Sequence, residues 1–321
     1  MFRQMKEHFI MRAIVTGATG FIGIALCEEL LKQGYEVVAV IRPQSERRKR
    51  LEELDHRNID GSQSLHVIEL ELNHLNILST ISNCKADLFY HLAWNGSSGA
   101  DRNDFEKQYC NITYTIEAIR AAKSCGCHKF IGAGSQAEYG VVHGMAMEEE
   151  TLPNPFMMYG AAKEAAYQMG KIVAEQENIT FIWPRIYSVY GIGENPGTLV
   201  NYVIDTLMKG EVPELSSCKN MWNFMNIADC VQALRVLGEQ NHMSGIVHIA
   251  SNDTRPLYKF VEEIRDIVSP GAKLDFGKKK SDSKRIFWLE PDCRKLNSIM
   301  KSQYISFQRG IREKVLSDSK R

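Results

Sequence analysis

The sequence predicts a doubly wound α/β fold, in which helices cover both faces of a mostly parallel sheet. Three observations indicate it. Short, apolar, β-branched segments alternate with helical patterns through the first 190 residues. Three glycines spaced GxxGxxG stand directly after the first of these segments, where a strand turns into a helix. From about residue 191 the alternation weakens, which indicates a smaller, mixed C-terminal lobe.

The strands and helices of the first half follow from their composition. Residues 12–16 form a short apolar run, and residues 35–41 (YEVVAVI) are β-branched and apolar, as in a buried strand. Residues 21–33 have a helical pattern that Gly34 closes. Strands that alternate with helices form a parallel sheet with right-handed crossovers. The remaining predicted strands are 65–70, 87–93, 128–134 and 179–187, and the remaining helices are 104–125 and 156–177.

The chain divides into three predicted parts. Residues 1–11 form an N-terminal extension, because charges are scattered through them and the first strand begins at residue 12. Residues 12–190 form the sheet with its helices, and residues 191–321 form mainly the smaller lobe, with some segments that return to the sheet. Within that lobe, helical patterns cover residues 198–209 and 226–240, whereas residues 275–292 are basic and irregular.

The glycine motif, TGATGFIG at residues 16–23, has the features of a dinucleotide-binding turn. Gly17 permits a tight turn, Gly20 lets a pyrophosphate approach the backbone, and Gly23 lets the helix pack closely on the sheet. The following helix points its free N–H groups and positive end at the phosphates. The alternative, a glycine-rich turn without a ligand, is disfavoured by the position between strand and helix. The predicted contacts are Gly17, Thr19, Gly20, Phe21, Ile22 and Gly23.

The end of the second predicted strand indicates which dinucleotide is bound. Sites that prefer NAD usually carry an Asp or Glu there, which binds the ribose hydroxyls. This chain carries Arg42, followed by Arg47 and Arg48, and a guanidinium can clamp a 2′-phosphate through its planar fork. We therefore expect NADP(H) in preference to NAD(H).

A Tyr-x-x-x-Lys motif, Tyr159 and Lys163, provides a proton-transfer group beside the dinucleotide. Residues four apart lie on one face of a helix. An unperturbed tyrosine has a pKa of about 10, and a nearby ammonium with the charge of an oxidised nicotinamide is expected to lower it. Ser135 ends the fifth predicted strand, where it can donate a hydrogen bond to a carbonyl or alcohol oxygen. Together with the glycine turn, these residues predict an enzyme that transfers a hydride.

The composition excludes several other classes of protein. The 321 residues include 39 basic and 39 acidic side chains, and zero net charge is not typical of a nucleic-acid-binding protein. No apolar run is long enough to cross a membrane, and the first residues lack the apolar core of a secretory signal, so we expect a cytoplasmic protein. The eight cysteines have no zinc-binding spacing and no other metal motif is present, so we predict reduced thiols and no metal.

With these motifs the chain resembles the extended short-chain dehydrogenase/reductase family, the NAD-dependent epimerase/dehydratase group, over roughly residues 12–300. The resemblance rests on TGATGFIG (16–23), HLA (91–93), Asn111, GSQAEYG (134–140), YGAAK (159–163), PRIYSVYG (184–191) and Asp229. It implies a catalytic set of Ser135, Tyr159 and Lys163, with Lys163 also binding the nicotinamide ribose. The further cofactor contacts that it implies are Glu71 and Leu72 at the adenine, Leu92, Ala93 and Trp94 at the ribose, and Ile186 at the nicotinamide.

The resemblance also implies a nucleotide-sugar substrate, bound mainly by the smaller lobe, and a homodimer formed through the two long helices. Trp222 stands where many members carry an arginine that reaches the diphosphate, so we expect it to stack on a base or a deoxysugar. The basic cluster Lys278, Lys279, Lys280, Lys284 and Arg285 is either the source of the missing charge or an exposed loop. The assigned substrate contacts are Gln136, Ser188, Leu199, Trp222 and Lys279.

The residues after Ser135 distinguish the reactions of such enzymes. Gln136 and Ala137 stand where sugar dehydratases carry an acid and a base, and Ala137 stands where some epimerases carry a cysteine. Plain hydride transfer remains. Arg42 then favours a net NADPH-dependent reductase. The Ala93–Trp94 pair, GSQAEYG (134–140) and residues 222–224 resemble reductases of 4-keto-6-deoxy sugar nucleotides, the group of the CDP-abequose and CDP-paratose synthases. The alternatives are an NAD-dependent 4-epimerase, a reductase of a non-sugar carbonyl, and a non-catalytic NADP(H)-sensing protein, although such sensors commonly lack the Tyr/Lys pair.

Overall fold

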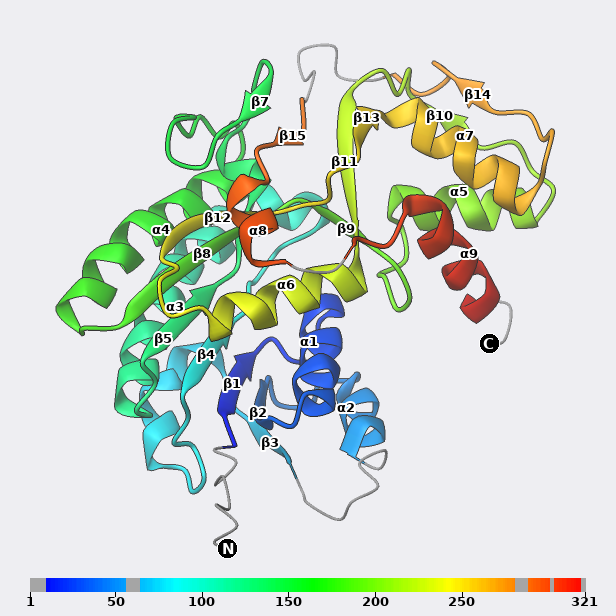
Figure 1. Cartoon of the computed structure of the whole chain (residues 1–321). Coiled ribbons are helices and arrows are strands. Elements are labelled where there is room, and N and C mark those ends of the chain that lie inside the picture. The colour runs from blue at the N-terminus through cyan, green and yellow to red at the C-terminus, as the bar shows by residue number, and fades with distance from the viewer. Residues whose placement is uncertain (1–9, 56–63, 281–287, 301–302, 319–321) are drawn as a thin grey trace, which may run out of the picture.

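The computed structural model describes residues 10–55, 64–280, 288–300 and 303–318 (Figure 1). Its centre is a parallel sheet in the order β12-β8-β5-β4-β1-β2-β3, with the short strand β6 also paired to β8. Helices cover both faces, which confirms the predicted doubly wound α/β class. The strands of this sheet are β1 (Arg12–Thr16), β2 (Glu36–Ile41), β3 (Leu65–Glu69), β4 (Leu88–His91), β5 (Lys129–Gly132), β6 (Gly134–Ser135), β8 (Thr180–Ile186) and β12 (Gly245–Ile249).

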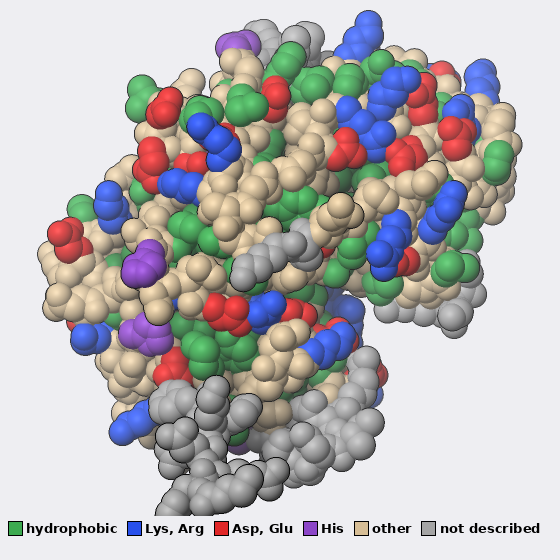
Figure 2. Space-filling model, in the orientation of Figure 1, with side chains coloured by type: hydrophobic (Ala, Val, Ile, Leu, Met, Phe, Trp, Pro, Cys, Tyr) green, Lys and Arg blue, Asp and Glu red, His purple; other side chains and the backbone are tan. Residues whose placement is uncertain are grey.

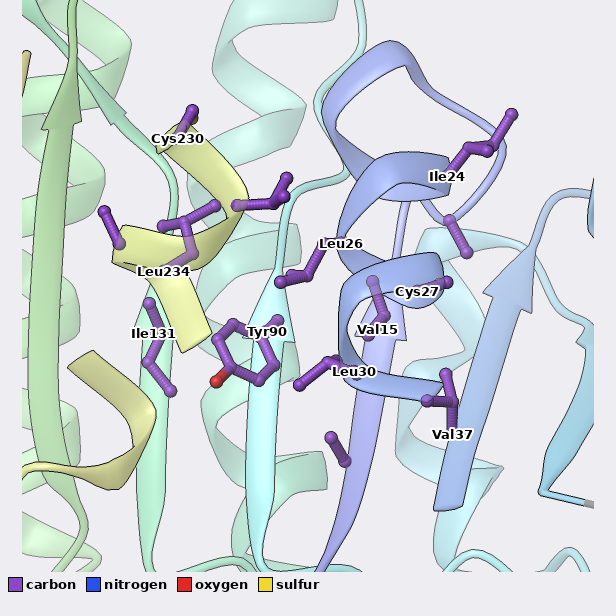
Figure 3. Close-up of a cluster of buried hydrophobic side chains, with 14 of the residues drawn as sticks. Val15, Ile24, Leu26, Cys27, Leu30, Val37, Tyr90, Ile131, Cys230 and Leu234 are labelled. Carbon is purple, nitrogen blue, oxygen red and sulfur yellow. The ribbon is translucent and has the colours of Figure 1, made fainter. Parts of the chain in front are cut away.

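One face of the sheet is covered by α1 (Phe21–Lys32) and α6 (Ile227–Glu239), which pack against each other. Figure 3 shows the core beneath them, where Leu30 of α1 and Leu234 of α6 lie over Tyr90 of β4. All three side chains are fully buried. This packing brings the start of α1, with its glycine turn, over the carboxyl ends of β1 and β4.

The opposite face is covered by α3 (Phe105–Ser124), α4 (Met158–Gln176) and the 3-10 segment η1 (Leu72–Thr80). Helices α3 and α4 lie side by side, and the rings of Phe130 and Phe181 stack beneath them at 5.8 Å between centroids. The first turn of α4 therefore lies at the carboxyl edge of the sheet, beside β5 and β6. That edge is where ligands meet sheets of this type.

The second lobe surrounds a small sheet of β9 (Ser188–Tyr190), β11 (Met221–Asn226) and β13 (Thr254–Pro256). Its core is aromatic, with Phe224, Phe260 and Phe307 in mutual contact at 4.8–5.4 Å between ring centroids. Figure 1 shows the short strands β10 and β14 at the outer end of this lobe. The remaining elements of the lobe are α5 (Leu199–Met208), α7 (Leu257–Val268), α9 (Phe307–Asp318), β10 (Glu214–Leu215) and β14 (Asp275–Phe276).

Two connections tie the second lobe to the main sheet. After β11 the chain returns through α6 to β12, which pairs with β8. Later, β15 (Glu290–Pro291) pairs with β7 (Met145–Ala146), and the next residue, Asp292, donates its backbone N–H to the carbonyl of Ala146 at 2.8 Å. Helix α8 (Arg294–Ile299) then packs beside β12.

The strands and helices predicted for the first half are all present, with ends that differ by at most two residues. The helices predicted at 198–209 and 226–240 correspond to α5 and α6. The sequence predicts a solvated helical face at Lys49 and Arg50 but no bounds for α2 (Arg48–Asp55), because RKRLEELD carries charge on most positions. Residues 1–9 of the predicted extension lie outside the described residues.

Acidic and basic side chains are interspersed over the face of the molecule shown in Figure 2. Within the ranges described, no helix combines the length and the apolar character that a bilayer crossing requires. The same ranges contain no group of three or more His, Cys, Asp or Glu side chains arranged to hold a metal ion. All eight cysteines are free thiols, and all but Cys110 are buried.

Candidate active site

The glycine turn between β1 and α1 forms a cradle of bare backbone. Gly17 has φ +70°, and a Cβ there would lie 2.7 Å from the backbone nitrogen of Ala93. At Gly23 a Cβ would lie 2.1 Å from the carbonyl oxygen of Gly17, so the helix packs on the turn without space for a side chain. Gly20 precedes α1, and no side chain caps this helix N-terminus. The free N–H groups and the absence of side chains fit a dinucleotide phosphate.

The buried polar side chain at the end of β4, His91, carries no charge beside the glycine turn. His91 at the end of β4 is hydrogen-bonded through Nδ1 to the hydroxyl of Thr16 at 2.9 Å. Burial lowers the pKa of His91 to about 3, with a further lowering by the charge of Lys163, so its ring is neutral near neutral pH. The same Thr16 hydroxyl accepts a weak hydrogen bond from the N–H of Ala93 at 3.4 Å. This contact joins the end of β4, with Leu92 and Ala93, to the end of β1 beside the glycine turn.

The residues predicted to contact the 2′-phosphate and the adenine follow the carboxyl ends of β2 and β3. Arg42 follows β2 with an exposed side chain, and Ser45 donates a hydrogen bond to the hydroxyl of Thr19 at 3.2 Å. The acid at the end of neighbouring β3, Glu69, is paired with Arg48 and is therefore engaged by a cation. Beyond it lie Glu71 and Leu72, the predicted adenine contacts, of which Glu71 is exposed and Leu72 packs on the core.

The structure brings Ser135, Tyr159 and Lys163 together at the carboxyl edge of the sheet. Ser135 ends β6 and Tyr159 is in the first turn of α4, where Ser135 is one of the groups that lower the pKa of Tyr159. Lys163, one turn further along α4, donates from Nζ to the carbonyl of Ala133 at 2.6 Å. Ile186, the predicted nicotinamide contact, is paired with Ser135 across β6 and β8. The proton-transfer set and the glycine cradle thus share one edge.

Trp94 connects the two halves of the site. Its ring lies under the Lys163 ammonium, with Nζ 3.5 Å from the ring centroid, and its edge meets the Tyr159 ring at 6.0 Å between centroids. Its indole N–H donates to Gln108 Oε1 at 2.9 Å. The indole is thereby held between Lys163 and Tyr159.

The charges at Tyr159 differ from the expectation that its pKa is lowered. In the protein alone, burial raises the pKa of Tyr159 above its usual range, although the hydrogen bond with Ser135 and the charge of Arg102 oppose this effect. Lys163 does not counteract it, because its Nζ is turned to Ala133 and Trp94 and lies 5.9 Å from the tyrosine ring centroid. Burial lowers the pKa of Lys163 itself, and Glu138 opposes that lowering.

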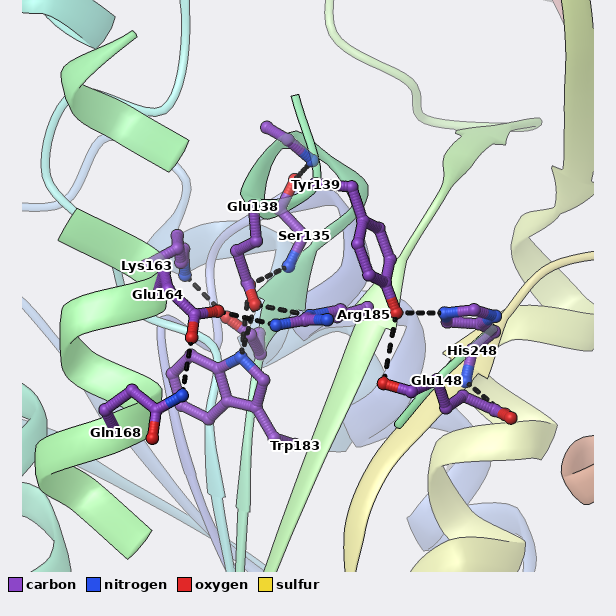
Figure 4. A network of polar contacts seen from close by, with 12 residues as sticks. Ser135, Glu138, Tyr139, Glu148, Lys163, Glu164, Gln168, Trp183, Arg185 and His248 are labelled. Carbon is purple, nitrogen blue, oxygen red and sulfur yellow. Dashed lines mark hydrogen bonds and ion pairs between the residues drawn. The ribbon is translucent and has the colours of Figure 1, made fainter. Parts of the chain in front are cut away.

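A buried ion network lies directly behind this set (Figure 4). Glu138, which is fully buried, accepts hydrogen bonds from the Ser135 backbone N–H at 2.7 Å and from Arg185 Nε at 2.6 Å. The other end of the Arg185 guanidinium donates to Glu164 at 2.6 Å, and Glu164 is the residue after Lys163. The network therefore ties the turn that carries Ser135 to the helix that carries Tyr159 and Lys163.

The segment after β4 is held by two polar side chains of α3. Asn111 accepts a hydrogen bond from the Asn95 backbone N–H and donates one back to the Asn95 carbonyl, each at 2.8 Å. Gln108 donates to the carbonyls of Gly96 at 2.8 Å and Asp101 at 2.9 Å. Asn111 is one of the residues on which the family resemblance rests, whereas the sequence analysis did not identify Gln108, which stands one helical turn before it.

The predicted substrate residues lie at different distances from the catalytic set. Gln136 directly follows Ser135, and Ser188 is paired with Phe224 across β9 and β11. Leu199 and Trp222 both pack on the aromatic core of the second lobe. Lys279 lies at the outer end of that lobe, where its ammonium is 4.1 Å from the Tyr202 ring centroid. The structure does not bring Lys279 beside Ser135 and Tyr159.

The basic cluster is only partly described. Lys278 is paired with Glu214 and Asp275, with the longer N–O distance at 3.8 Å. Its charge is thus partly neutralised at the outer end of the second lobe. Lys284 and Arg285 lie outside the described residues.

A glycine cradle beside a Ser–Tyr–Lys set on a doubly wound sheet defines a class of nicotinamide-dinucleotide enzymes with a catalytic tyrosine. The chain belongs to the NAD dependent epimerase/dehydratase family, whose model matches residues 13–250. This confirms the family indicated by the sequence motifs. It identifies the protein as an NAD-dependent oxidoreductase or epimerase of this family.

Three known proteins illustrate the similarity. An uncharacterized UDP-glucose epimerase, YtcB, of Bacillus subtilis (strain 168) is 26% identical over 87% of this chain and 89% of its own. CDP-abequose synthase of Salmonella muenchen is 23% identical over 83% of this chain and 84% of its own. The crystal structure of UDP-glucuronic acid 4-epimerase from Bacillus cereus, in complex with UDP-glucuronic acid and NAD, matches with a TM-score of 0.80. It is 22% identical and covers 97% of this chain and 99% of its own.

Proposed function

We propose that this protein is an NADPH-dependent reductase that converts the keto group of a nucleotide-linked 4-keto-6-deoxy sugar to an alcohol. One observation carries the proposal. Ser135, Tyr159 and Lys163 lie together, and the turn after Ser135 provides no second acid–base pair. Gln136 and Ala137 cannot take up a proton. The carboxylate of Glu138 is engaged by Arg185 and by the Ser135 N–H. One proton donor is sufficient for a ketone reduction but not for dehydration.

Each residue then has a distinct role in the proposed reaction. The glycine turn would hold a nicotinamide dinucleotide, which would supply the hydride for the carbonyl carbon. Tyr159 donates its phenolic proton to the carbonyl oxygen as the C=O π electrons move onto that oxygen. The Ser135 hydroxyl donates a hydrogen bond to the same oxygen and stabilises the charge that develops there. Lys163, whose Nζ lies beside Trp94, binds the ribose hydroxyls and orients the cofactor.

The relatives support a nucleotide-sugar substrate. CDP-abequose synthase and an uncharacterized UDP-glucose epimerase both match more than four fifths of this chain. We propose that the substrate lies between the catalytic edge and the second lobe, with Gln136 and Ser188 near the sugar and Leu199 and Trp222 nearer the nucleotide. The indole nitrogen of Trp222 is buried without a hydrogen-bond acceptor among the described residues, which is consistent with a ring that contributes through its face.

The choice of NADP(H) predicts the effect of one substitution. We expect Arg42→Ala to weaken NADPH binding by about tenfold to a hundredfold, because a charge-assisted hydrogen bond contributes about 1.5–3 kcal/mol. NADH binding should change little, since it has no 2′-phosphate. Fluorescence titration of both cofactors measures the difference. Lys49→Ala, which removes an exposed charge from α2, is the matched control. Equal weakening of both cofactors would contradict the proposed preference.

A second candidate function is NAD-dependent 4-epimerisation of a nucleotide sugar. The specific observation in its favour is the match to the Bacillus cereus 4-epimerase bound to NAD, which extends over nearly the whole chain. The same Ser–Tyr–Lys set serves both reactions, because an epimerase oxidises and then reduces the same carbon. The difference lies in the fate of the cofactor, which a reductase consumes and an epimerase regenerates.

One assay distinguishes the two functions. The protein is incubated with NADPH and, separately, with CDP-, dTDP-, GDP- and UDP-linked 4-keto-6-deoxy sugars while the absorbance of reduced nicotinamide is followed. A stoichiometric loss of that absorbance with one of them supports the reductase. Interconversion of a pair of 4-hydroxy sugars without net cofactor consumption would instead assign the epimerase. Tyr159→Phe protein provides the blank for contaminating reductases.

We also propose a homodimer formed by α3 and α4. These two helices lie side by side and expose large apolar side chains, which a soluble monomer usually limits. Tyr109 of α3 and Ile172 of α4 are each 57% exposed. Pairing this face with a second copy gives a four-helix bundle with twofold symmetry.

Ile172→Glu tests the dimer. The substitution places a charge in the centre of the proposed apolar interface, so we expect sedimentation to change from dimer to monomer at micromolar concentration. Leu316→Glu, at a 63% exposed position of α9, is the control that should leave the mass unchanged. A wild-type protein that already sediments as a monomer would rule out the interface.

A further inference from the structure

A second cation lies on the catalytic tyrosine candidate. Arg102, from the 3-10 turn η2 (Gly99–Asn103), places its guanidinium carbon 4.5 Å from the centroid of the Tyr159 ring. This is closer than the ammonium of Lys163, which lies 5.9 Å from the same centroid. A guanidinium over an aromatic face is attracted by the electron density of the ring. The attraction grows when the ring becomes a phenolate.

The guanidinium of Arg102 faces the ring of Tyr159. Its Nε is buried and has no hydrogen-bond acceptor among the described residues. The neighbouring acid, Asp101, is engaged elsewhere, because its carboxylate accepts a hydrogen bond from the Lys107 ammonium at 2.7 Å. A buried N–H group without an acceptor costs free energy, so the position of this nitrogen calls for an explanation.

The turn that carries Arg102 is held from both sides. The carbonyl of Asp101 accepts a hydrogen bond from Gln108 Nε2 at 2.9 Å. The side chain of Asn103 accepts one from the backbone N–H of Met158 at 3.2 Å, and Met158 is the residue before Tyr159. These two contacts fasten the residues before and after Arg102 to α3 and α4. The backbone on either side of Arg102 is therefore held between α3 and α4.

The other groups around Tyr159 do not replace this cation. Ser135 lowers the pKa of Tyr159, and the negative charge of Glu138 raises it. The Lys163 ammonium is directed to the Ala133 carbonyl and the Trp94 ring. Burial raises the pKa of Tyr159, and Arg102 and Ser135 are the groups that oppose this increase.

We propose that Arg102 is a positioning residue that stabilises the phenolate of Tyr159, so that the tyrosine can exchange its proton in both directions of the reaction. The proposal rests on the role of Tyr159 in the proposed function, and it adds a cation from the segment after β4 to the Ser–Tyr–Lys set. In the reductive direction the phenol has released its proton to the product alcohol, and Arg102 stabilises the anion that remains. In the oxidative direction the same anion accepts the proton.

The experiment measures the ionisation of residue 159 without substrate or cofactor. Site-specific incorporation of 3,5-difluorotyrosine at position 159 gives a single fluorine NMR signal, and fluorination brings the titration into a range that the protein tolerates. Arg102→Met and Arg102→Gln are compared with the parent protein, and Arg120→Met, an exposed arginine of α3, is the matched control. We expect both neutral variants to raise the apparent pKa of residue 159 by about 1–2 units, and the control to leave it unchanged.

The outcomes separate this proposal from the proposed function. An unchanged titration in whichever Arg102 variant folds, as judged by circular dichroism, overturns the role of Arg102 even if the protein proves to be a reductase. A shifted titration supports it even if no sugar nucleotide in the panel is turned over. Where a substrate has been identified, the pH–rate profile of oxidation should shift upward by the same amount. If Arg102→Met changes only KM, and neither the titration nor the profile, then Arg102 binds an anionic group of the substrate instead.

Discussion

Tyr159→Phe is expected to lower kcat by about a thousandfold with the substrate that the cofactor assay identifies, since positioned proton transfer contributes about 10²–10⁴-fold to rates. The substitution removes only the phenolic oxygen. The ring that remains still meets Trp94 at 6.0 Å and still lies under Arg102. The loss should therefore reflect the missing proton rather than an altered pocket.

The measurement combines steady-state kinetics with cofactor binding. NADPH affinity, followed by fluorescence, should stay within a factor of about two of the parent value, because Lys163 and the glycine turn are unchanged. Tyr109→Phe, on an exposed position of α3, removes the same atom away from the site and should be neutral. A Tyr159→Phe protein that retains a tenth or more of the parent kcat would mean that another group donates the proton.

Arg185→Met is expected to destabilise the protein by about 3–5 kcal/mol, because removing one partner of a buried ion pair leaves an unpaired charge. Arg185 is 1% exposed and lies between Glu138 and Glu164. Without it, the donors to Glu138 among the described residues are the Ser135 N–H and Trp183. Urea denaturation monitored by circular dichroism measures the change in the free energy of unfolding.

Two further variants separate charge from packing. In the double variant Glu138→Gln/Arg185→Met the buried carboxylate is gone, so we expect it to be more stable than Arg185→Met alone. Arg309→Met removes an arginine that is 68% exposed and paired with Glu313, and should cost about 0.5 kcal/mol or less. If Arg185→Met costs no more than Arg309→Met, the network contributes nothing to stability.

The sheet and its helices could be predicted from the sequence because each element depends mainly on local composition. The β-branched segment of β2 and the glycines around α1 carry their structural preferences in a few consecutive residues. The same holds for the Tyr159–Lys163 spacing, which places both side chains on one helix face. The position of Ser135 at a strand end followed from the topology that these elements imply.

The surroundings of the catalytic set could not be predicted in this way. Arg102 and Tyr159 are 57 residues apart in the sequence. Arg185 is 47 residues from Glu138 and 21 residues from Glu164, and it binds both. The hydrophobic periodicity of the sequence does not indicate such contacts, because they depend on how separate helices and strands pack together. Glu138 illustrates the problem, because its sequence position is equally compatible with a substrate contact and with the buried ion pair that the structure contains.

The pairing of β7 with β15 has a consequence for how the enzyme is made in the cell. Met145 and Ala146 follow the catalytic serine candidate by only ten residues or so, yet their partners Glu290 and Pro291 are translated 145 residues later. A nascent chain on the ribosome can therefore complete the strands through β8 while the segment after Ser135 still lacks its anchor. We expect such chains to be protease-sensitive between β6 and α4, and activity to be acquired as a late event in synthesis.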